Sequence, residues 1–194
     1  MSQSLFAGWR PDAAGRLQLQ ELATALAGTR PANATRLQPR SPDQWHVTLC
    51  FVGKNVAHLV KPDLLSALGD AAASIPAHDF RIERLTYWPG SGAVVALPYR
   101  CRELQALCDA TRFAFRRCGI RPMQATHQPH ITLAYLDLHQ PPQAWLEDID
   151  CSGAPLLATN FELLFNPGGH YEALGCWPLT GAAIPPEPRQ STLF

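Results

Sequence analysis

Two stretches of the chain, residues 45–52 and 129–136, carry the hydrophobic and polar pattern of a β-strand. Each contains the sequence His-x-Thr-Leu among branched or aromatic residues, a composition typical of strands. Successive side chains of a strand point to opposite faces. Each stretch therefore predicts a strand with a histidine and a threonine on one face and hydrophobic residues on the other.

Strict alternation also predicts the faces of the residues beyond each threonine. Small residues continue the polar face, while the aromatic residues Phe51 and Tyr135 fall on the opposite, hydrophobic face. The surface beyond the threonines then has little bulk. The predicted polar faces consist of His46, Thr48 and Cys50 in one strand and of His130, Thr132 and Ala134 in the other.

The segments before the two stretches repeat the order strand, helix, loop. In the first half, residues 5–9 predict a strand, residues 11–28 a helix that ends at a glycine, and residues 29–43 a polar loop. In the second half, residues 93–97 predict a strand and residues 104–118 an amphipathic helix. We expect an α+β fold with two pseudo-symmetric lobes, each a mainly antiparallel sheet with helices on its outer face, around a central cleft. Both motif faces would line that cleft.

The chain is predicted to form one two-lobed domain over residues 1–180, which is long enough to bury a sizeable core. Within it, residues 159–165 and 171–179 predict a hairpin about the Asn-Pro-Gly-Gly turn at residues 166–169. The proline-rich residues 181–194 have little to bury and are expected to form a C-terminal tail.

Composition narrows the choice of partners. The formal net charge is zero, so no broad basic surface is expected for long nucleic acid, and an RNA substrate would be held by its end. The six cysteines include no Cys-x-x-Cys pair, which favours free thiols in a reducing compartment. The sequence shows neither a signal peptide nor an apolar run of membrane length. We expect a cytoplasmic monomer with no membrane partner.

The residues of the repeated motif fit acid–base chemistry on a phosphate. Imidazole titrates near neutrality, so His46 and His130 can give and take protons there. The hydroxyls of Thr48 and Thr132 can donate hydrogen bonds to phosphoryl oxygens. This chemistry requires no metal, and no Gly-x-x-x-x-Gly-Lys-[Ser/Thr] motif for ATP is present. The residues alone leave open which histidine is the acid.

The two His-x-Thr-Leu motifs, 84 positions apart, resemble those of the 2H phosphoesterase superfamily. Within it, the chain is similar to the RNA 2′,3′-cyclic phosphodiesterase family, also called the 2′-5′ RNA ligase family. The opening strand, the continuation of the first motif as Phe51-Val52-Gly53, and the final segment from Tyr171 to Leu179 follow that family's order. The resemblance covers roughly residues 4–180.

The resemblance implies an activity and a role for each histidine. His46 is the implied proton donor, and His130 is the implied proton acceptor that activates water. The implied reaction is hydrolysis of RNA 2′,3′-cyclic phosphodiester ends to 2′-phosphomonoesters, which in reverse gives 2′-5′ RNA ligation. The implied substrates are RNA ends or small cyclic nucleotides, with no cofactor and no metal.

Five further residues are candidates for substrate binding. Arg36 and Arg40, in the loop before the first motif, can reach a phosphate, and Phe51 and Tyr171 offer rings that can stack on a base. Tyr135, in the second motif strand, is the fifth candidate. Members of the family often carry an arginine shortly after the second motif. Tyr135 follows that motif in this chain and cannot supply a positive charge.

Three other functions remain open from the sequence. The nearest is another 2H activity, on cyclic nucleotide-ribose or 2′-5′ oligonucleotide substrates. The second is a metal site built from His127, His130 and His46, which would leave the two threonines without a role. The third is a non-catalytic binder of RNA ends, in which replacing His46 would remove affinity instead of turnover.

Overall fold

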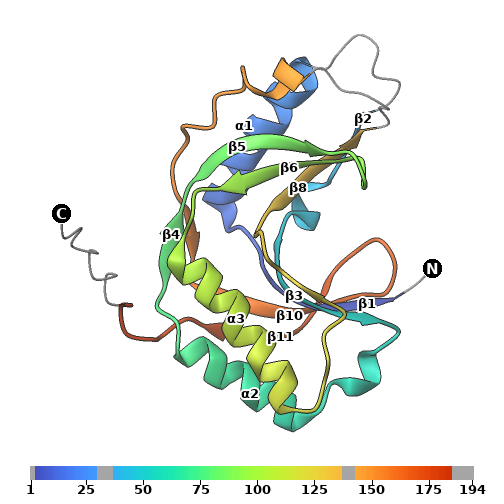
Figure 1. Cartoon of the computed structure of the whole chain (residues 1–194), viewed down its shortest axis with the longest axis vertical. Helices are drawn as coiled ribbons and strands as arrows, with labels where there is room; N and C mark the ends of the chain where they lie inside the picture. Colours follow the sequence, from blue (N-terminus) through green and yellow to red (C-terminus); the bar gives the residue numbers. More distant parts are fainter. Residues whose placement is uncertain (1–2, 30–36, 137–142, 185–194) are drawn as a thin grey trace, which may run out of the picture.

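The computed structural model describes residues 3–29, 37–136 and 143–184 (Figure 1). Arg36, a candidate for phosphate binding, and residues 185–194 of the predicted tail lie outside these ranges. The described elements are, in chain order, β1 (Ser4–Trp9), α1 (Ala13–Gly28), β2 (Leu37–Pro39), η1 (Pro42–Gln44), β3 (Val47–Lys54), η2 (Ala57–Leu59), α2 (Pro62–Ala73), β4 (His78–Phe80), β5 (Ile82–Trp88), β6 (Ala93–Pro98), α3 (Arg102–Arg117), β7 (Gln124–Ala125), β8 (Ile131–Leu136), η3 (Gln143–Leu146), β9 (Leu156–Ala158), β10 (Asn160–Asn166) and β11 (Glu172–Pro178).

Most of these strands belong to one antiparallel sheet. Its order is β11-β10-β1-β3-β8-β6-β5, with β2 beside β8 and β7 beside β3, while β4 and β9 form a separate ribbon. The predicted α+β class with a mainly antiparallel sheet is confirmed. The hairpin predicted near the C-terminal end is also confirmed, as β10 and β11.

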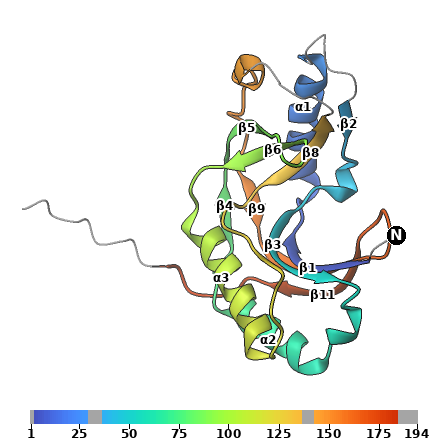
Figure 2. The ribbon, with the colours of Figure 1, turned by 45° about the vertical axis from the view of Figure 1, so that its right-hand side comes forward.

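The sheet divides into two lobes at the contact between β3 and β8 (Figures 1 and 2). One lobe holds β11, β10, β1 and β3, and helices α2 and α3 lie side by side against it. The other lobe holds β8, β6 and β5, and α1 packs against it. In the described part of the chain, no helix is both long and apolar enough to cross a membrane.

The two long helices are exchanged between the lobes. Helix α1 follows β1 along the chain but packs against β8 of the other lobe. Helix α3 follows β6 but packs against β3 and α2. Each lobe is therefore completed by a helix from the other half of the sequence repeat.

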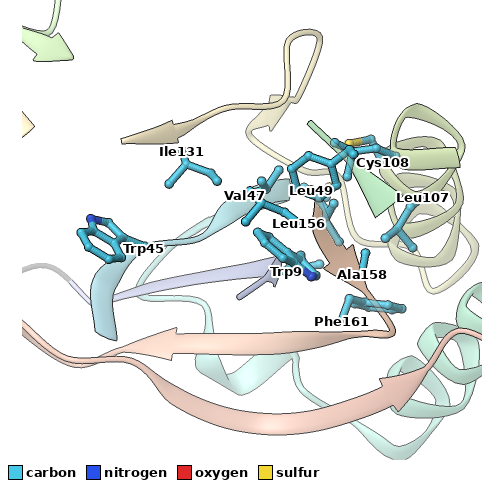
Figure 3. Packing of buried hydrophobic residues seen from close by; sticks show 14 of the residues in the cluster. Trp9, Trp45, Val47, Leu49, Leu107, Cys108, Ile131, Leu156, Ala158 and Phe161 are labelled. Atoms are coloured by element: carbon cyan, nitrogen blue, oxygen red, sulfur yellow. The ribbon is translucent and has the colours of Figure 1, made fainter. Parts of the chain in front are cut away.

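A single residue pair joins the two motif strands. Val47 of β3 is paired with Ile131 of β8, and neither side chain has any exposed surface. Figure 3 shows the two side chains beside one another, with Leu49 pointing toward Leu107 and Cys108 of α3. The hydrophobic face of each motif strand thus anchors it in a shared core.

Each motif strand contains a β-bulge one residue after its threonine. In β3 the extra residue is Leu49, because its neighbours Thr48 and Cys50 pair with consecutive residues of β1. In β8 the extra residue is Leu133, between two residues that pair with consecutive positions of β6. Both leucines are buried.

The bulges make the predicted faces wrong beyond each threonine. Cys50 and Ala134, expected on the polar face, are buried in the core, whereas Phe51 and Tyr135, expected on the hydrophobic face, line the cleft. A bulge adds one residue to the count and so reverses the alternation after it. The cleft is therefore bounded by two aromatic rings in place of two small groups.

Candidate active site

The register between the lobes brings the four polar motif side chains together. His46 and His130 each directly precede the residue pair that joins β3 to β8. In an antiparallel register, His46 then lies across from Thr132, and His130 lies across from Thr48. Because the joining pair points into the core, these four side chains point into the cleft.

All four side chains line one chamber of the cleft, with a volume of about 260 Å³. Its described lining includes one arginine and two histidines but no carboxylate, so a phosphate anion would meet no negative side chain there. The residues that line this chamber are Ser4, Phe6, Arg40, His46, Thr48, Phe51, His130, Thr132, Tyr135, Asn166 and Tyr171.

The ring of His46 is held by a backbone carbonyl and two aromatic residues. Its Nδ1 lies 2.8 Å from the carbonyl oxygen of Gln44. A carbonyl only accepts hydrogen bonds, so Nδ1 donates and Nε2 is left to exchange a proton with a ligand. Phe6 and Tyr171 pack on the ring, with centroids 4.9 and 5.0 Å away.

His130 is held in the same way on the other lobe. Its Nδ1 lies 2.9 Å from the carbonyl oxygen of Gln128, which again leaves Nε2 for proton exchange. The indole of Trp88 packs against this ring with a centroid distance of 4.4 Å. The two imidazoles therefore present the same nitrogen from opposite sides of the junction.

Burial lowers the pKa of both histidines. The pKa of His46 falls to about 4, because burial and then the positive charge of Arg40 lower it against the opposing effect of the Gln44 carbonyl. Burial also lowers the pKa of His130, and the Gln128 carbonyl opposes this. Both rings are neutral near pH 7 when the chamber holds no anion.

Hydroxyl groups and a guanidinium complete the chamber. Neither Thr48 nor Thr132 uses its hydroxyl in a hydrogen bond with another described residue, so both are available to a ligand. Arg40 enters from the end of β2, where its backbone N–H donates to the carbonyl oxygen of Leu133 at 2.8 Å. The site can thus offer two proton-exchanging nitrogens, two hydroxyl donors and one cation to a single phosphate.

A second chamber of about 480 Å³ continues the cleft on the His130 side. It is bounded by three aromatic side chains, Phe51, Tyr135 and Trp88, and by several hydrogen-bonding groups. The residues that line it are Thr48, Phe51, Trp88, Ser91, Ala93, Gln124, Thr126, His127, Gln128, His130, Thr132 and Tyr135. Five of these also line the first chamber, so the two chambers adjoin one another.

The structure brings the described candidate residues into one place. Every site residue proposed from the sequence, apart from Arg36, which lies outside the described ranges, lines the first chamber. Tyr171 has an unexpected environment, because its ring packs edge-on against Phe6 and His46, with interplanar angles of 83° and 81°. The sequence had suggested this ring as a surface for stacking on a base.

Sequence reasoning missed the side chains that hold the histidines, Phe6 and Trp88. It also missed part of the repeat. A glutamine stands two residues before each motif histidine, at Gln44 and Gln128, and these are the residues whose carbonyls bind Nδ1. An aromatic residue stands five positions after each histidine. This longer repeat was a usable signal for the cleft.

The structure gives no support to the metal-site alternative. Among the described residues, no three His, Cys, Asp or Glu side chains are grouped so that they could hold a metal ion. His127, considered as a ligand together with His130, is exposed and lines the second chamber and a separate surface pocket, but not the first chamber.

Comparison with known families shows to which family the chain belongs. The model of the 2′-5′ RNA ligase superfamily matches residues 11–164, which include both motifs. The chain belongs to the 2′-5′ RNA ligase superfamily. The resemblance to 2H phosphoesterases drawn from the paired motifs is thereby confirmed at the level of the superfamily. Curated protein sequences give no significant match.

Solved structures share the fold of this superfamily member. A structure from Thermus thermophilus, TT0787, is 23% identical with a TM-score of 0.72, over 93% of this chain and 100% of the other. Escherichia coli LigT complexed with 3′-AMP is 23% identical with a TM-score of 0.63, over 92% and 98% of the two chains. LigT complexed with NADP+ is 23% identical with a TM-score of 0.62, over 93% and 99%.

Proposed function

We propose that the protein hydrolyses RNA 2′,3′-cyclic phosphodiester ends to 2′-phosphomonoesters, with His46 as the proton donor and His130 as the proton acceptor. The observation that carries the proposal is the chamber itself. Two imidazoles with the same nitrogen available meet there without any described carboxylate. The superfamily is one of phosphoesterases, and the chemistry of these residues fits that class.

The proposed reaction needs two proton transfers on opposite sides of phosphorus. His130 takes a proton from water as the water oxygen bonds to phosphorus. The bond from phosphorus to O3′ breaks, and His46 gives its proton to the departing oxygen, which leaves the phosphate on O2′. Thr48 and Thr132 donate hydrogen bonds to the non-bridging oxygens, and Arg40 stabilises their negative charge.

The substrate itself supplies the required protonation state. His46 must carry a proton before it can act as the acid, yet its pKa is about 4 in the ligand-free protein. A phosphodiester anion next to the ring favours the charged form and raises this pKa. We therefore expect a bell-shaped dependence of turnover on pH, with one limb from each histidine.

The second chamber suits the nucleoside that carries the cyclic phosphate. It adjoins the chamber of the histidines, and the rings of Phe51, Tyr135 and Trp88 at its boundary offer surfaces on which a base can stack. Structures of E. coli LigT with 3′-AMP and with phosphate are among the similar ones. These ligands agree with a substrate class of nucleotides that bear a phosphate.

The decisive experiment uses a short oligoribonucleotide that ends in a 2′,3′-cyclic phosphate. We expect ³¹P NMR to identify a 2′-phosphomonoester as the product. His46→Gln and His130→Gln should each lower kcat by about 10²–10⁴-fold, since each removes one positioned proton transfer. His58→Gln, at an exposed histidine outside both chambers, serves as the matched control and should keep wild-type turnover.

Other products would decide between this proposal and its alternatives. A 3′-phosphate product would contradict the assigned bond cleavage, and loss of activity after chelation would contradict metal-independent chemistry. Faster turnover of a cyclic nucleotide-ribose compound or a 2′-5′ oligonucleotide would assign the site to another 2H activity. Binding without turnover would assign it to RNA-end recognition. An excess of a 5′-hydroxyl oligonucleotide in the same assay tests the reverse reaction, 2′-5′ ligation.

A further inference from the structure

The positive charge of the chamber reaches it from a neighbouring strand. Arg40 follows β2, which pairs with β8 from Leu37 opposite Leu136 to Pro39 opposite Ala134. The backbone N–H of Arg40 donates to the carbonyl oxygen of Leu133 at 2.8 Å, which continues the same antiparallel register by one residue. The backbone of Arg40 is therefore tied to the second motif strand at the point where that strand enters the chamber.

Two tyrosines hold the Arg40 guanidinium. Nη2 of Arg40 donates to the hydroxyl oxygen of Tyr171 at 3.0 Å. The guanidinium carbon lies 5.8 Å from the ring centroid of Tyr135, within the range of a cation–π contact. Among the described residues, no carboxylate lies within ion-pair distance of Arg40, so its charge is available to a ligand.

The ring of Tyr171 is partly buried and packs against two other rings of the chamber. It packs edge-on against Phe6, with a centroid distance of 5.3 Å, and against the proposed acid His46, with a centroid distance of 5.0 Å. Burial raises the pKa of its hydroxyl, so the group stays a neutral phenol. One side chain therefore contacts both the imidazole and the cation of the chamber.

We propose that Tyr171 is a positioning residue that fixes the Arg40 guanidinium beside His46, so that the cation binds the same phosphate on which the histidine acts. The inference rests on the proposed function, because it assigns the phosphate to this chamber. Tyr171 acts here through Arg40. This role differs from base stacking, since it uses the hydroxyl of Tyr171 and not a face of its ring.

The experiment compares four proteins: wild type, Tyr171→Phe, Arg40→Ala and the double variant. Tyr171→Phe keeps the ring that packs on His46 and removes only the hydroxyl. We expect it to weaken binding of inorganic phosphate about fivefold, the size of effect that one hydrogen bond of this kind gives. In the Arg40→Ala background the same change should alter binding by less than about twofold, because the hydroxyl then has no guanidinium to hold.

Binding is measured by calorimetry and by NMR of the histidine rings, which shows that the phosphate occupies the chamber. Tyr99→Phe, at an exposed tyrosine outside both chambers, controls for the loss of a phenol as such and should bind phosphate like the wild type. An equal effect of Tyr171→Phe with and without Arg40 would overturn the inference and indicate a merely structural contribution. Wild-type affinity in Tyr171→Phe would overturn it as well.

The same variants are then assayed on the cyclic-phosphate oligonucleotide. We expect the fall in kcat/KM of Tyr171→Phe to disappear in the Arg40→Ala background, as it does for phosphate binding. If the wild type shows no turnover, the proposed function fails, yet the phosphate titration still decides whether Tyr171 positions Arg40. The two proposals can thus fail separately.

Discussion

The two histidines have the same backbone anchor but different surroundings. His46 lies between Phe6 and Tyr171, close enough to Arg40 for that charge to lower its pKa. His130 meets one aromatic residue, Trp88. The motif fixes which nitrogen is available, and residues distant in sequence set how readily that nitrogen takes a proton.

The low pKa of His46 predicts an acid-sensitive fold. In the unfolded chain the imidazole of His46 takes up a proton near pH 6.5, whereas in the folded protein it does so only at about pH 4. Stability is therefore complete above pH 6.5 and falls as the pH approaches 4, by about 2–3 kcal/mol from this group. Urea denaturation at pH 7.5 and 4.5 measures the loss, and His46→Gln should lose less over this interval. Equal losses in both proteins would contradict the assignment.

The position of Arg40 over Tyr135 predicts that an arginine at position 135 can compensate for the loss of Arg40. Removing the guanidinium in Arg40→Ala should lower kcat/KM about 10–100-fold, as expected for a charge-assisted hydrogen bond to phosphate. Because Tyr135 lies under that guanidinium and lines the same chamber, an arginine in its place can return the charge. We expect Tyr135→Arg to raise the kcat/KM of the Arg40→Ala protein about tenfold. In the wild-type background the same substitution should give no gain.

For single residues, the sequence indicated the reactive groups but not the side chains that surround them. The repeated motif was enough to select His46 and His130. The residues that pack on them are far away along the chain, as Tyr171 is from His46. No local pattern connects such positions, because the contact exists only after β1, β3 and β10 have paired.

Among the elements, the two bulges decide what the cleft contains. Without them, Phe51 and Tyr135 would be in the core and the cleft would end in small groups. Hydrophobic periodicity predicted the strands correctly but could not show the bulges, because a bulge is defined by the register with the neighbouring strand. The local sign of a bulge in the sequence was a pair of adjacent residues after each threonine that are often buried, such as Leu49 and Cys50.

The turn between β5 and β6 sets the place of Trp88 and predicts a sensitive glycine. Gly92 has φ of +69°, and a Cβ there would lie 2.9 Å from the backbone oxygen of Leu136. Gly92→Ala should destabilise the protein by about 1–3 kcal/mol and lower turnover, because Trp88 would no longer hold His130. Denaturation midpoints and kcat of the folded variant measure the two effects.

Gly28 provides the control for that substitution. It is the last residue of α1, its φ is not positive, and a Cβ there would meet nothing within 4 Å. Gly28→Ala should be neutral or slightly stabilising, since alanine has the higher helix propensity. A loss of stability as large as that of Gly92→Ala would mean that the turn has no special requirement.

For the whole molecule, the junction between the lobes sets the distance between acid and base. Ile131 is fully buried in the one pair that joins β3 to β8. Ile131→Ala should cost about 2–5 kcal/mol of stability and also reduce kcat of the folded protein, as the lobes lose their common register. Leu68→Ala, at an equally buried position in α2, should cost similar stability but keep kcat.

Two lobes were predictable from the sequence because the order of elements repeats. The exchange of α1 and α3 between them was not, since each helix is amphipathic and would cover either sheet equally well. Only the packing of the complete chain selects the arrangement that the structure has.

The place of β1 in the sheet has a consequence for the protein as it is made. This strand lies between β3 and β10, and Ser4 pairs with Asn166, 162 residues later in the chain. At about 5–20 residues per second, a ribosome needs on the order of ten seconds or more to deliver that partner. During synthesis β1 therefore keeps one open edge until β10 has emerged, and a chaperone that shields such edges would bind the nascent chain during this interval.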